Sequence, residues 1–241
     1  MSYLRTIEEI NSFSDAAVVP VGSLEQHGRH LPVCTDIIIA QSYADRIGEE
    51  LNAYTLPCLP ISTAYEHKGK RGSVWMNADT FYRMLCDIVL NLKDQGFKKI
   101  VVLKGHGGIF VMDPAVRHLN ANHNPDLTVC MLEQNFPDAI SGILDSKADL
   151  HSGEYETSIM LHLRPDLVKM ELAVDHDPGV PRQYLQYGSI FNYCPDGVWG
   201  SATLATADKG RRCFDAILKE SLRYIDDVFT MTEGRSYGAA R

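Results

Sequence analysis

The chain alternates short, β-branched apolar runs with stretches of helical periodicity, and this alternation restricts its fold more than any other feature. The apolar runs cover residues 15–23, 54–61, 98–105 and 127–134. They are nearly continuous, as expected for strands that are covered on both faces. Amphipathic segments lie between them: one begins at Thr35, a residue type favoured at helix N-caps, and another ends at Gly96. The pattern predicts an α/β fold with a mostly parallel sheet between helices.

Size and charge narrow the classes of function. At 241 residues the chain can bury a large core, and no linker rich in Pro, Gly or Ser divides it, so we expect one domain over residues 1–241. The net charge of -8 provides no basic surface for nucleic acid or an anionic membrane. The N-terminal sequence lacks the pattern of a signal peptide, and no apolar run is long enough to span a bilayer. We therefore expect a cytoplasmic protein that acts on a small molecule.

The six cysteines are scattered and form no CxxC pair. This spacing predicts reduced thiols that serve as packing residues. Cys34 lies inside a polar motif, but a small apolar role is the stronger interpretation there than a catalytic thiol.

Polar residues cluster where three of the predicted elements end or begin. The clusters are VGSLEQHGRHLP (residues 21–32), KGHGGIF (residues 104–110) and DLHSGEYETSIML (residues 149–161). In open parallel sheets the ligand crevice lies outside the carboxyl ends of the strands. We therefore expect the three clusters to meet at one edge of the sheet.

These clusters and the following helix supply acids and imidazoles that together indicate a metal site. The candidate ligands are Glu25, His27, Asp36, His106 and Glu156. Without a cation, such a group would hold repelling carboxylates in poor solvation. Three carboxylates and two imidazoles suit two ions that share one carboxylate and keep positions open for water. Oxygen and imidazole ligands fit Zn or Mn, with Fe also compatible, and the lack of cysteine argues against a structural zinc site.

Three neighbouring polar residues have supporting roles in this prediction. Gln26 and His30 are expected to orient the ligands, because a histidine ligand usually has its second nitrogen held by a nearby polar group. Lys104 precedes the GHGG turn and either contacts substrate, neutralises excess carboxylate or points to solvent.

The ordered motifs VGSLEQHGRHLP with the following TD, GHGG and HSGEYETS resemble those of the creatininase family, the creatinine amidohydrolase-like hydrolases. A weaker match follows at GVWGSATLATADKG, residues 197–210. The resemblance implies a three-layer α/β/α sandwich, a binuclear Zn or Mn site with a water nucleophile, and a homo-oligomeric ring, often a hexamer.

The resemblance also implies roles for individual residues. One ion belongs to Glu25 and His106, the other to His27 and Glu156, and Asp36 bridges them. His151 matches the family's proton-handling histidine.

Two departures from the family pattern concern the substrate. True creatininases have a glutamate where this chain has Gly108, and tryptophans near the third motif where this chain has none, which argues against creatinine itself. Glu154 is the catalytic carboxylate that the resemblance offers in place of the missing one.

In the loop of residues 65–75, Arg71 to Val74 replace the usual PGT turn. The loop from Lys68 to Trp75 either binds a polar or anionic substrate group or is simply solvated.

Three functions remain open at this level. The leading one is a metal-dependent hydrolase that cleaves a cyclic amide or a formamide-like C–N bond. The second is a hydrolase that opens a cyclic polyketone or an inosose-type ring at a C–C bond. The third is a metal-binding subunit without catalysis.

Overall fold

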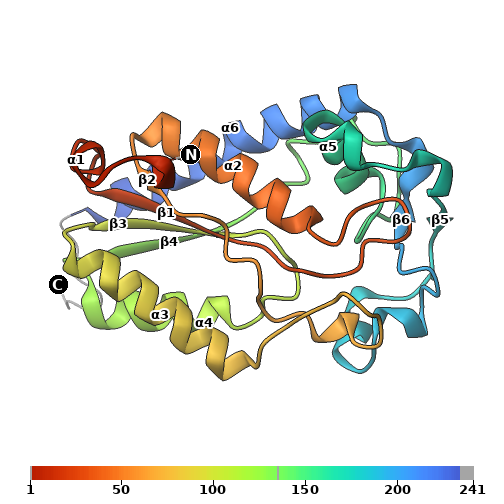
Figure 1. Cartoon of the computed structure of the whole chain (residues 1–241), viewed down its shortest axis with the longest axis horizontal. Coiled ribbons are helices and arrows are strands. Elements are labelled where there is room, and N and C mark those ends of the chain that lie inside the picture. Colours follow the sequence, from red (N-terminus) through yellow and green to blue (C-terminus); the bar gives the residue numbers. More distant parts are fainter. Residues whose placement is uncertain (1, 135, 234–241) are drawn as a thin grey trace.

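A four-stranded parallel sheet forms the centre of the protein in this computed structural model, which describes residues 2–134 and 136–233 (Figure 1). The strand order is β2-β1-β3-β4. A second, two-stranded antiparallel sheet pairs β5 with β6. The strands are β1 (Ala16–Val21), β2 (Tyr54–Thr55), β3 (Lys99–Lys104), β4 (Thr128–Glu133), β5 (Asp175–His176) and β6 (Gly200–Ser201). The α-helices are α1 (Ile7–Ile10), α2 (Thr35–Leu51), α3 (Ala78–Asp94), α4 (Met112–His123), α5 (Glu154–Leu163) and α6 (Ala207–Thr232).

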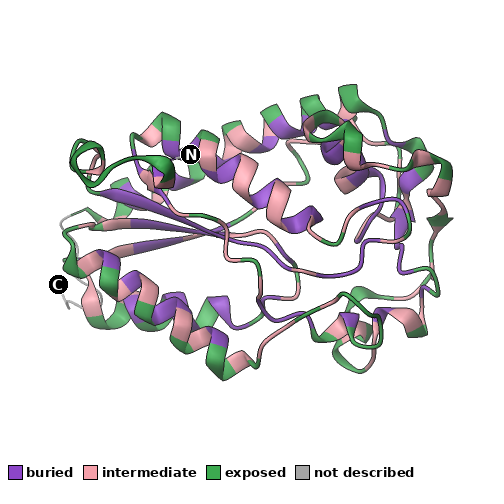
Figure 2. Cartoon of the chain, in the orientation of Figure 1, coloured by how far each residue is buried: buried purple, intermediate pink, exposed green. Residues whose placement is uncertain are grey.

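Helices cover both faces of the central sheet, with α2, α5 and α6 on one side and α3 and α4 on the other (Figures 1 and 2). Successive residues of β1 pack on opposite faces of the sheet, in two separate hydrophobic clusters. Val18 belongs to the cluster of Tyr43 and Phe214, and Val19 belongs to the cluster of Phe81. Both faces of the strand are therefore buried, which explains its continuous apolar sequence. The three-layer α/β architecture expected from the sequence is confirmed.

The predicted elements agree with the observed ones except at two places. The run at residues 54–61 forms only the two-residue strand β2, because Pro57 and Pro60 cannot donate a ladder hydrogen bond. Thr35 is the first residue of α2 and not its cap; its hydroxyl donates to the carbonyl of Pro32 at 2.7 Å. Helix α3 ends as expected before Gly96, whose φ of 98° is in the left-handed region.

The amino end of α2 packs directly against the carboxyl ends of β1 and β3. A Cβ atom on Gly105, the residue after β3, would lie 2.6 Å from the Cβ of Ala40 and 2.8 Å from the carbonyl oxygen of Val21. Only glycine permits this approach. As a result, the first turn of α2 and the loops after β1 and β3 surround the same point.

The six cysteines are all free thiols, and four of them are buried. Burial raises the pKa of Cys58 and of Cys130 to about 12, which keeps both thiols protonated. Within residues 2–134 and 136–233, no helix has the length and apolar character needed to cross a membrane.

Candidate metal centre

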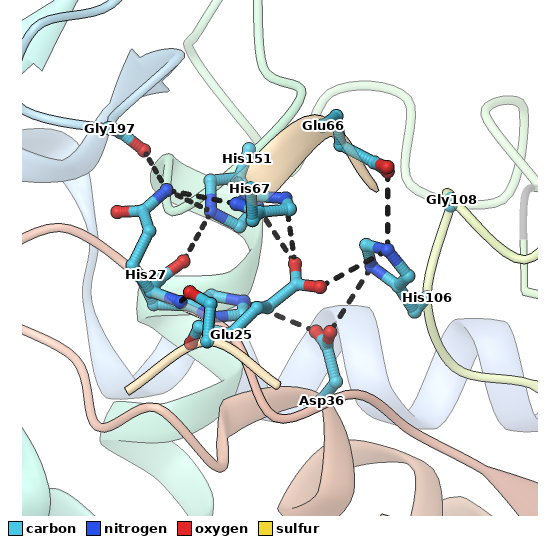
Figure 3. Close-up of polar contacts among 12 residues, drawn as sticks. Glu25, His27, Asp36, Glu66, His67, His106, Gly108, His151 and Gly197 are labelled. Carbon is cyan, nitrogen blue, oxygen red and sulfur yellow. Dashed lines mark hydrogen bonds and ion pairs between the residues drawn. The ribbon is translucent and has the colours of Figure 1, made fainter. Parts of the chain in front are cut away.

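Residues from four separate segments meet at the carboxyl edge of the sheet (Figure 3). Glu25 and His27 lie in the loop after β1, Asp36 lies in the first turn of α2, His106 follows β3, and Glu156 lies in the first turn of α5. Glu25 and His27 have no exposed surface, and Asp36 is 3% exposed. The structure therefore brings together all five residues that the sequence motifs had indicated.

Asp36 stands between the two histidines of this group. Its Oδ1 atom lies 3.2 Å from Nε2 of His27, and its Oδ2 atom lies 3.3 Å from Nδ1 of His106. On the far side of His106, Nε2 lies 3.1 Å from Oε2 of Glu25. On the far side of Asp36, Nε2 of His27 lies 3.7 Å from Oε2 of Glu156. The carboxylate of Asp36 thus faces both halves of the cluster.

Most of the candidate ligand atoms are buried without a hydrogen-bond partner among the described residues. These atoms are both carboxylate oxygens of Glu25, Nε2 of His27, Oδ2 of Asp36 and Nε2 of His106. Buried polar atoms rarely stay unsatisfied, because losing water without a replacement partner costs about 1–3 kcal/mol for each group. Carboxylate oxygens and imidazole nitrogens are ligands for Zn or Mn. The donor set therefore fits divalent cations.

The hydrogen bonding of His27 leaves a lone pair for a cation. Its Nδ1 atom lies 3.2 Å from the carbonyl oxygen of Glu25, which can only accept a hydrogen bond. Nδ1 therefore carries a proton in either charge state, and Nε2, which faces Asp36 and Glu156, is the nitrogen whose lone pair becomes available once a cation displaces its proton. A backbone carbonyl is a common support for a metal-binding histidine.

The charges within the cluster shift the pKa values of its members. Burial disfavours the charged form of His27, but Asp36 and Glu156 outweigh it and raise the pKa to about 10. Burial and the charge of Asp36 raise the pKa of Glu156 to about 7, against the opposing effect of His27. The cluster thus holds protons that a cation has to displace, so metal binding is expected to release protons and to weaken at low pH.

His67, which the sequence motifs did not identify, is a further buried member of the cluster. It ends the short 3-10 helix η2 (Tyr65–His67), is 2% exposed, and places Nε2 3.0 Å from Oε1 of Glu25. The groups Glu25–His67–His106, Glu25–His27–His151 and His27–Asp36–Glu156 each bring three potential ligand atoms within 4.8 Å of one another. In the sequence, His67 belongs only to the loop of residues 65–75 and lies outside the three motifs.

Gln26 contacts both His67 and His151, and the supporting role that we expected for it stays a prediction. Its Oε1 atom accepts from the backbone N–H of Gly28 at 2.9 Å, which fixes the orientation of the amide. Its Nε2 atom then faces Nδ1 of His67 at 3.2 Å and the carbonyl of Gly197 at 3.1 Å. An amide nitrogen only donates, so Nδ1 of His67 accepts and its Nε2–H points at Glu25. His67 therefore directs its protonated nitrogen toward Glu25, at an ion-pair distance of 3.0 Å.

His151 lies beside the cluster and is 8% exposed. Its backbone pairs with Trp199, and its ring stands 4.4 Å from the ring of His27 and 4.5 Å from that of His67, measured between centroids. Burial, together with the charges of these two histidines, holds the pKa of His151 well below its usual range. The imidazole is thus neutral near pH 7, with one ring nitrogen that can accept a hydrogen bond.

His30 and Lys104 have contacts at the edge of the site. Nε2 of His30 lies 2.9 Å from the hydroxyl of Thr157, the residue after Glu156, so His30 supports the first turn of α5. Nζ of Lys104 donates to Glu133 at 3.0 Å, across the ends of β3 and β4. Lys104 thus pairs with a carboxylate outside the cluster, and the roles left open for it stay predictions.

Glu154, expected as a catalytic carboxylate, is directed away from the cluster. It is fully buried, accepts from the backbone N–H groups of Asp145 at 2.9 Å and Ser146 at 2.6 Å, and pairs with Lys209. The reason is helical geometry: residues two apart on α5 point to opposite sides, so Glu154 and Glu156 cannot face the same site. The contacts indicate a structural ion pair.

Three similar proteins illustrate how much of the chain its relatives match. A mycofactocin precursor peptide peptidase from Mycobacterium tuberculosis is 30% identical, over 91% of this chain and 88% of its own length. A creatinine amidohydrolase from Pseudomonas putida is 27% identical, over 89% and 90%. A 3-dehydro-scyllo-inosose hydrolase from Thermotoga maritima is 25% identical, over 93% and 81%.

Solved structures share the fold. A crystal structure of creatinine amidohydrolase (creatininase) superimposes with a TM-score of 0.79 at 25% identity, covering 96% of this chain and 97% of that one. Two other creatininase structures, described as a Zn-Zn type and as a Mn form, have TM-scores of 0.75 and 0.76. The family model for creatininase, creatinine amidohydrolase, matches residues 4–225. This match spans the sheet, the four segments of the cluster and most of α6, and the chain therefore belongs to the creatininase family.

Proposed function

We propose that this protein is a metal-dependent hydrolase with two divalent ions per chain, zinc or manganese, that cleaves a C–N bond of a small cyclic amide or a formamide-like compound. One observation carries the proposal: the two oxygens of Asp36 face His27 and His106, and each histidine also faces a further carboxylate. This arrangement supports two neighbouring ions that share Asp36. Glu25 and His106 would hold one ion, and His27 and Glu156 the other.

When bound, a pair of such ions activates a water molecule near neutral pH and polarises the carbonyl of the substrate. The protein residues supply what the ions do not. His67 holds Glu25 in place, and His30 and Thr157 support the turn that carries Glu156. His151, a neutral imidazole at the cluster, is placed to take a proton released by the attacking water and to pass it to the leaving nitrogen.

A cavity beside α5 offers room for a small substrate. Its volume is about 410 Å³, within the usual range for ligand sites. Phe136, Ile140, Leu144 and Tyr155 line it together with Glu156, so one of the proposed ligands borders it directly. Of the five candidate ligands only Glu156 lines the cavity, so the cavity reaches the proposed metal site at one edge.

The identity of the bond is tested by loading the metal-free protein with Zn or Mn and assaying a panel of compounds. The panel includes cyclic amides, formamides, short peptides and inosose-type ketones, because relatives are named for more than one of these reactions. We expect turnover of a C–N substrate that depends on the added metal. Cleavage of the ketone alone would favour the C–C hydrolase, and metal binding without turnover of any compound would favour a non-catalytic subunit.

The proposal also covers the oligomeric state and the cellular location of the protein. We expect a homo-oligomer, a hexamer by resemblance to the family, and a cytoplasmic location. Light scattering of the metal-loaded protein tests the first: a particle well above the 26.9 kDa of one chain is expected, and an active monomer would contradict it.

A further inference from the structure

A carboxylate that belongs to none of the three sequence motifs reaches the cluster. Glu66 lies in η2, and its Oε1 atom is 3.3 Å from Nε2 of His106 (Figure 3). The same nitrogen lies 3.1 Å from Oε2 of Glu25. The side chain of Glu66 is only 15% exposed. Two carboxylates from different loops therefore converge on one buried nitrogen that has no hydrogen-bond partner among the described residues.

Gly108 makes room for this carboxylate. A Cβ atom at position 108 would overlap Oε1 of Glu66 and would also press on Nε2 of His106. Any other residue at position 108 would thus have to displace Glu66, His106 or both. The loop is held in this form by the hydroxyl of Thr63, which donates to the carbonyl of Gly108 at 2.8 Å.

The segment that carries Glu66 is anchored on both sides. The hydroxyl of Ser189 lies 3.0 Å from the carbonyl oxygens of both Glu66 and Lys68. The next residue, His67, is fixed by Gln26 and Glu25. Glu66 is therefore held at His106 by its surroundings, as expected for a residue that belongs to a preorganised site.

The charges around His106 are unbalanced without a cation. Its ring faces the carboxylates of Glu25, Asp36 and Glu66, at 3.1 Å, 3.3 Å and 3.3 Å. A protonated His106 offsets only one of these three charges, and the protonated His27 beside Asp36 also faces the further carboxylate of Glu156. Grouping buried or nearly buried carboxylates in this way is costly unless a cation joins them.

We propose that Glu66 is an additional carboxylate ligand of the ion held by Glu25 and His106. This inference rests on the proposed two-ion function and deepens it. The ion held by Glu25 and His106 would have three acidic ligands, Glu25, Asp36 and Glu66, whereas the other ion would have two, Asp36 and Glu156. Hard oxygen ligands favour Mn over softer alternatives. The two positions should therefore differ in metal preference, with the Glu25–His106–Glu66 position being the better site for Mn.

The test is the Glu66→Gln variant, which keeps the size of the side chain and removes its charge. Metal-free wild type and variant are titrated with Mn and with Zn in competition with a chromophoric chelator. We expect one of the two ions to bind about 10- to 100-fold more weakly in the variant, with the larger loss for Mn, while the other keeps its affinity. The Glu49→Gln variant, on the exposed face of α2, is the matched control and should bind both ions as the wild type does.

Two further readouts separate the outcomes. Saturating Mn should raise the melting temperature of Glu66→Gln less than that of the wild type at the same concentration, since bound metal stabilises the fold by mass action. Glu66→Ala should repeat the loss of Mn affinity. If the wild type binds two ions and Glu66→Gln binds both with unchanged affinity, the Glu66 assignment is overturned while the two-ion function stands. If the wild type itself binds fewer than two ions, the two-ion function is what fails, and the assignment with it.

Discussion

Nε2 of His151 lies 2.8 Å from the carbonyl oxygen of Gln26. A carbonyl oxygen only accepts, and the two N–H bonds of the Gln26 amide, whose nitrogen lies 3.1 Å from the same ring nitrogen, are directed at His67 and Gly197. Nε2 of His151 therefore carries the proton and Nδ1 keeps a lone pair. Nδ1 lies 3.8 Å from Oε1 of Glu25, at the edge of the proposed metal site. Of the two ring nitrogens, Nδ1 is thus the one placed to accept a proton from the reaction and to pass it on.

Replacing His151 should slow turnover without removing metal. His151→Ala or His151→Gln is expected to lower kcat by about 10²- to 10⁴-fold, the usual contribution of a positioned acid or base. Elemental analysis and circular dichroism should show metal content and folding close to those of the wild type. Wild-type turnover would end the proton-transfer role, whereas loss of metal would make His151 a ligand.

Replacing Asp36 should affect both ions together. Asp36→Ala removes the only carboxylate that faces both His27 and His106 within the described cluster, so we expect the variant to lose both ions. Asp87→Ala, at an exposed position of α3, is the control and should retain two. Elemental analysis after gel filtration decides: an Asp36→Ala protein that keeps two ions and full activity rules out the bridge.

The ion pair of Glu154 with Lys209 should contribute to stability and not to chemistry. Glu154→Ala leaves Lys209 and two backbone N–H groups without their buried partner, and is expected to lower the free energy of unfolding by about 3 kcal/mol. The double variant with Lys209→Met should recover part of this loss. Urea denaturation measures both. A folded Glu154→Ala protein whose turnover falls by orders of magnitude would restore the catalytic role.

The strands and the positions of the five candidate ligands could be predicted from the sequence for the same reason. Buried parallel strands have a continuous apolar pattern, and residues that directly follow them must lie at the carboxyl edge of the sheet. Glu25, His27 and His106 satisfy this rule, and Asp36 and Glu156 follow because each lies in a first helical turn that points to the same edge.

Glu66 and His67 could not be predicted in this way. Their segment follows β2, which is only two residues long, and its position depends on contacts with Ser189 and Gln26, which are distant in sequence. The role of Glu154 was equally hidden, because its partner Lys209 lies at the start of α6. Sequence spacing identifies residues near the site, but it does not establish which side of a helix or loop each one faces.

The last prediction concerns the effect of His30 on stability at acidic pH. The residue is 1% exposed, and its Nδ1 atom is buried without a hydrogen-bond partner among the described residues. Burial, with a further contribution from the charge of His27, lowers the pKa of His30 from 6.5 to about 4. The unfolded chain therefore binds a proton at His30 near pH 6.5, whereas the folded protein does so only near pH 4.

Between these values the unfolded state binds more protons, so the contribution of His30 to stability is complete above about pH 6.5 and is lost as the pH falls toward 4. In His30→Gln this loss should be absent. We expect metal-free wild type to lose more unfolding free energy than metal-free His30→Gln between these two pH values, as measured by urea denaturation. Using metal-free protein for both removes the loss of stability that comes from metal release in acid. Equal losses in the two proteins would mean that His30 is solvated or already charged in the folded state, and that its hydrogen bond to Thr157 does not depend on a neutral ring.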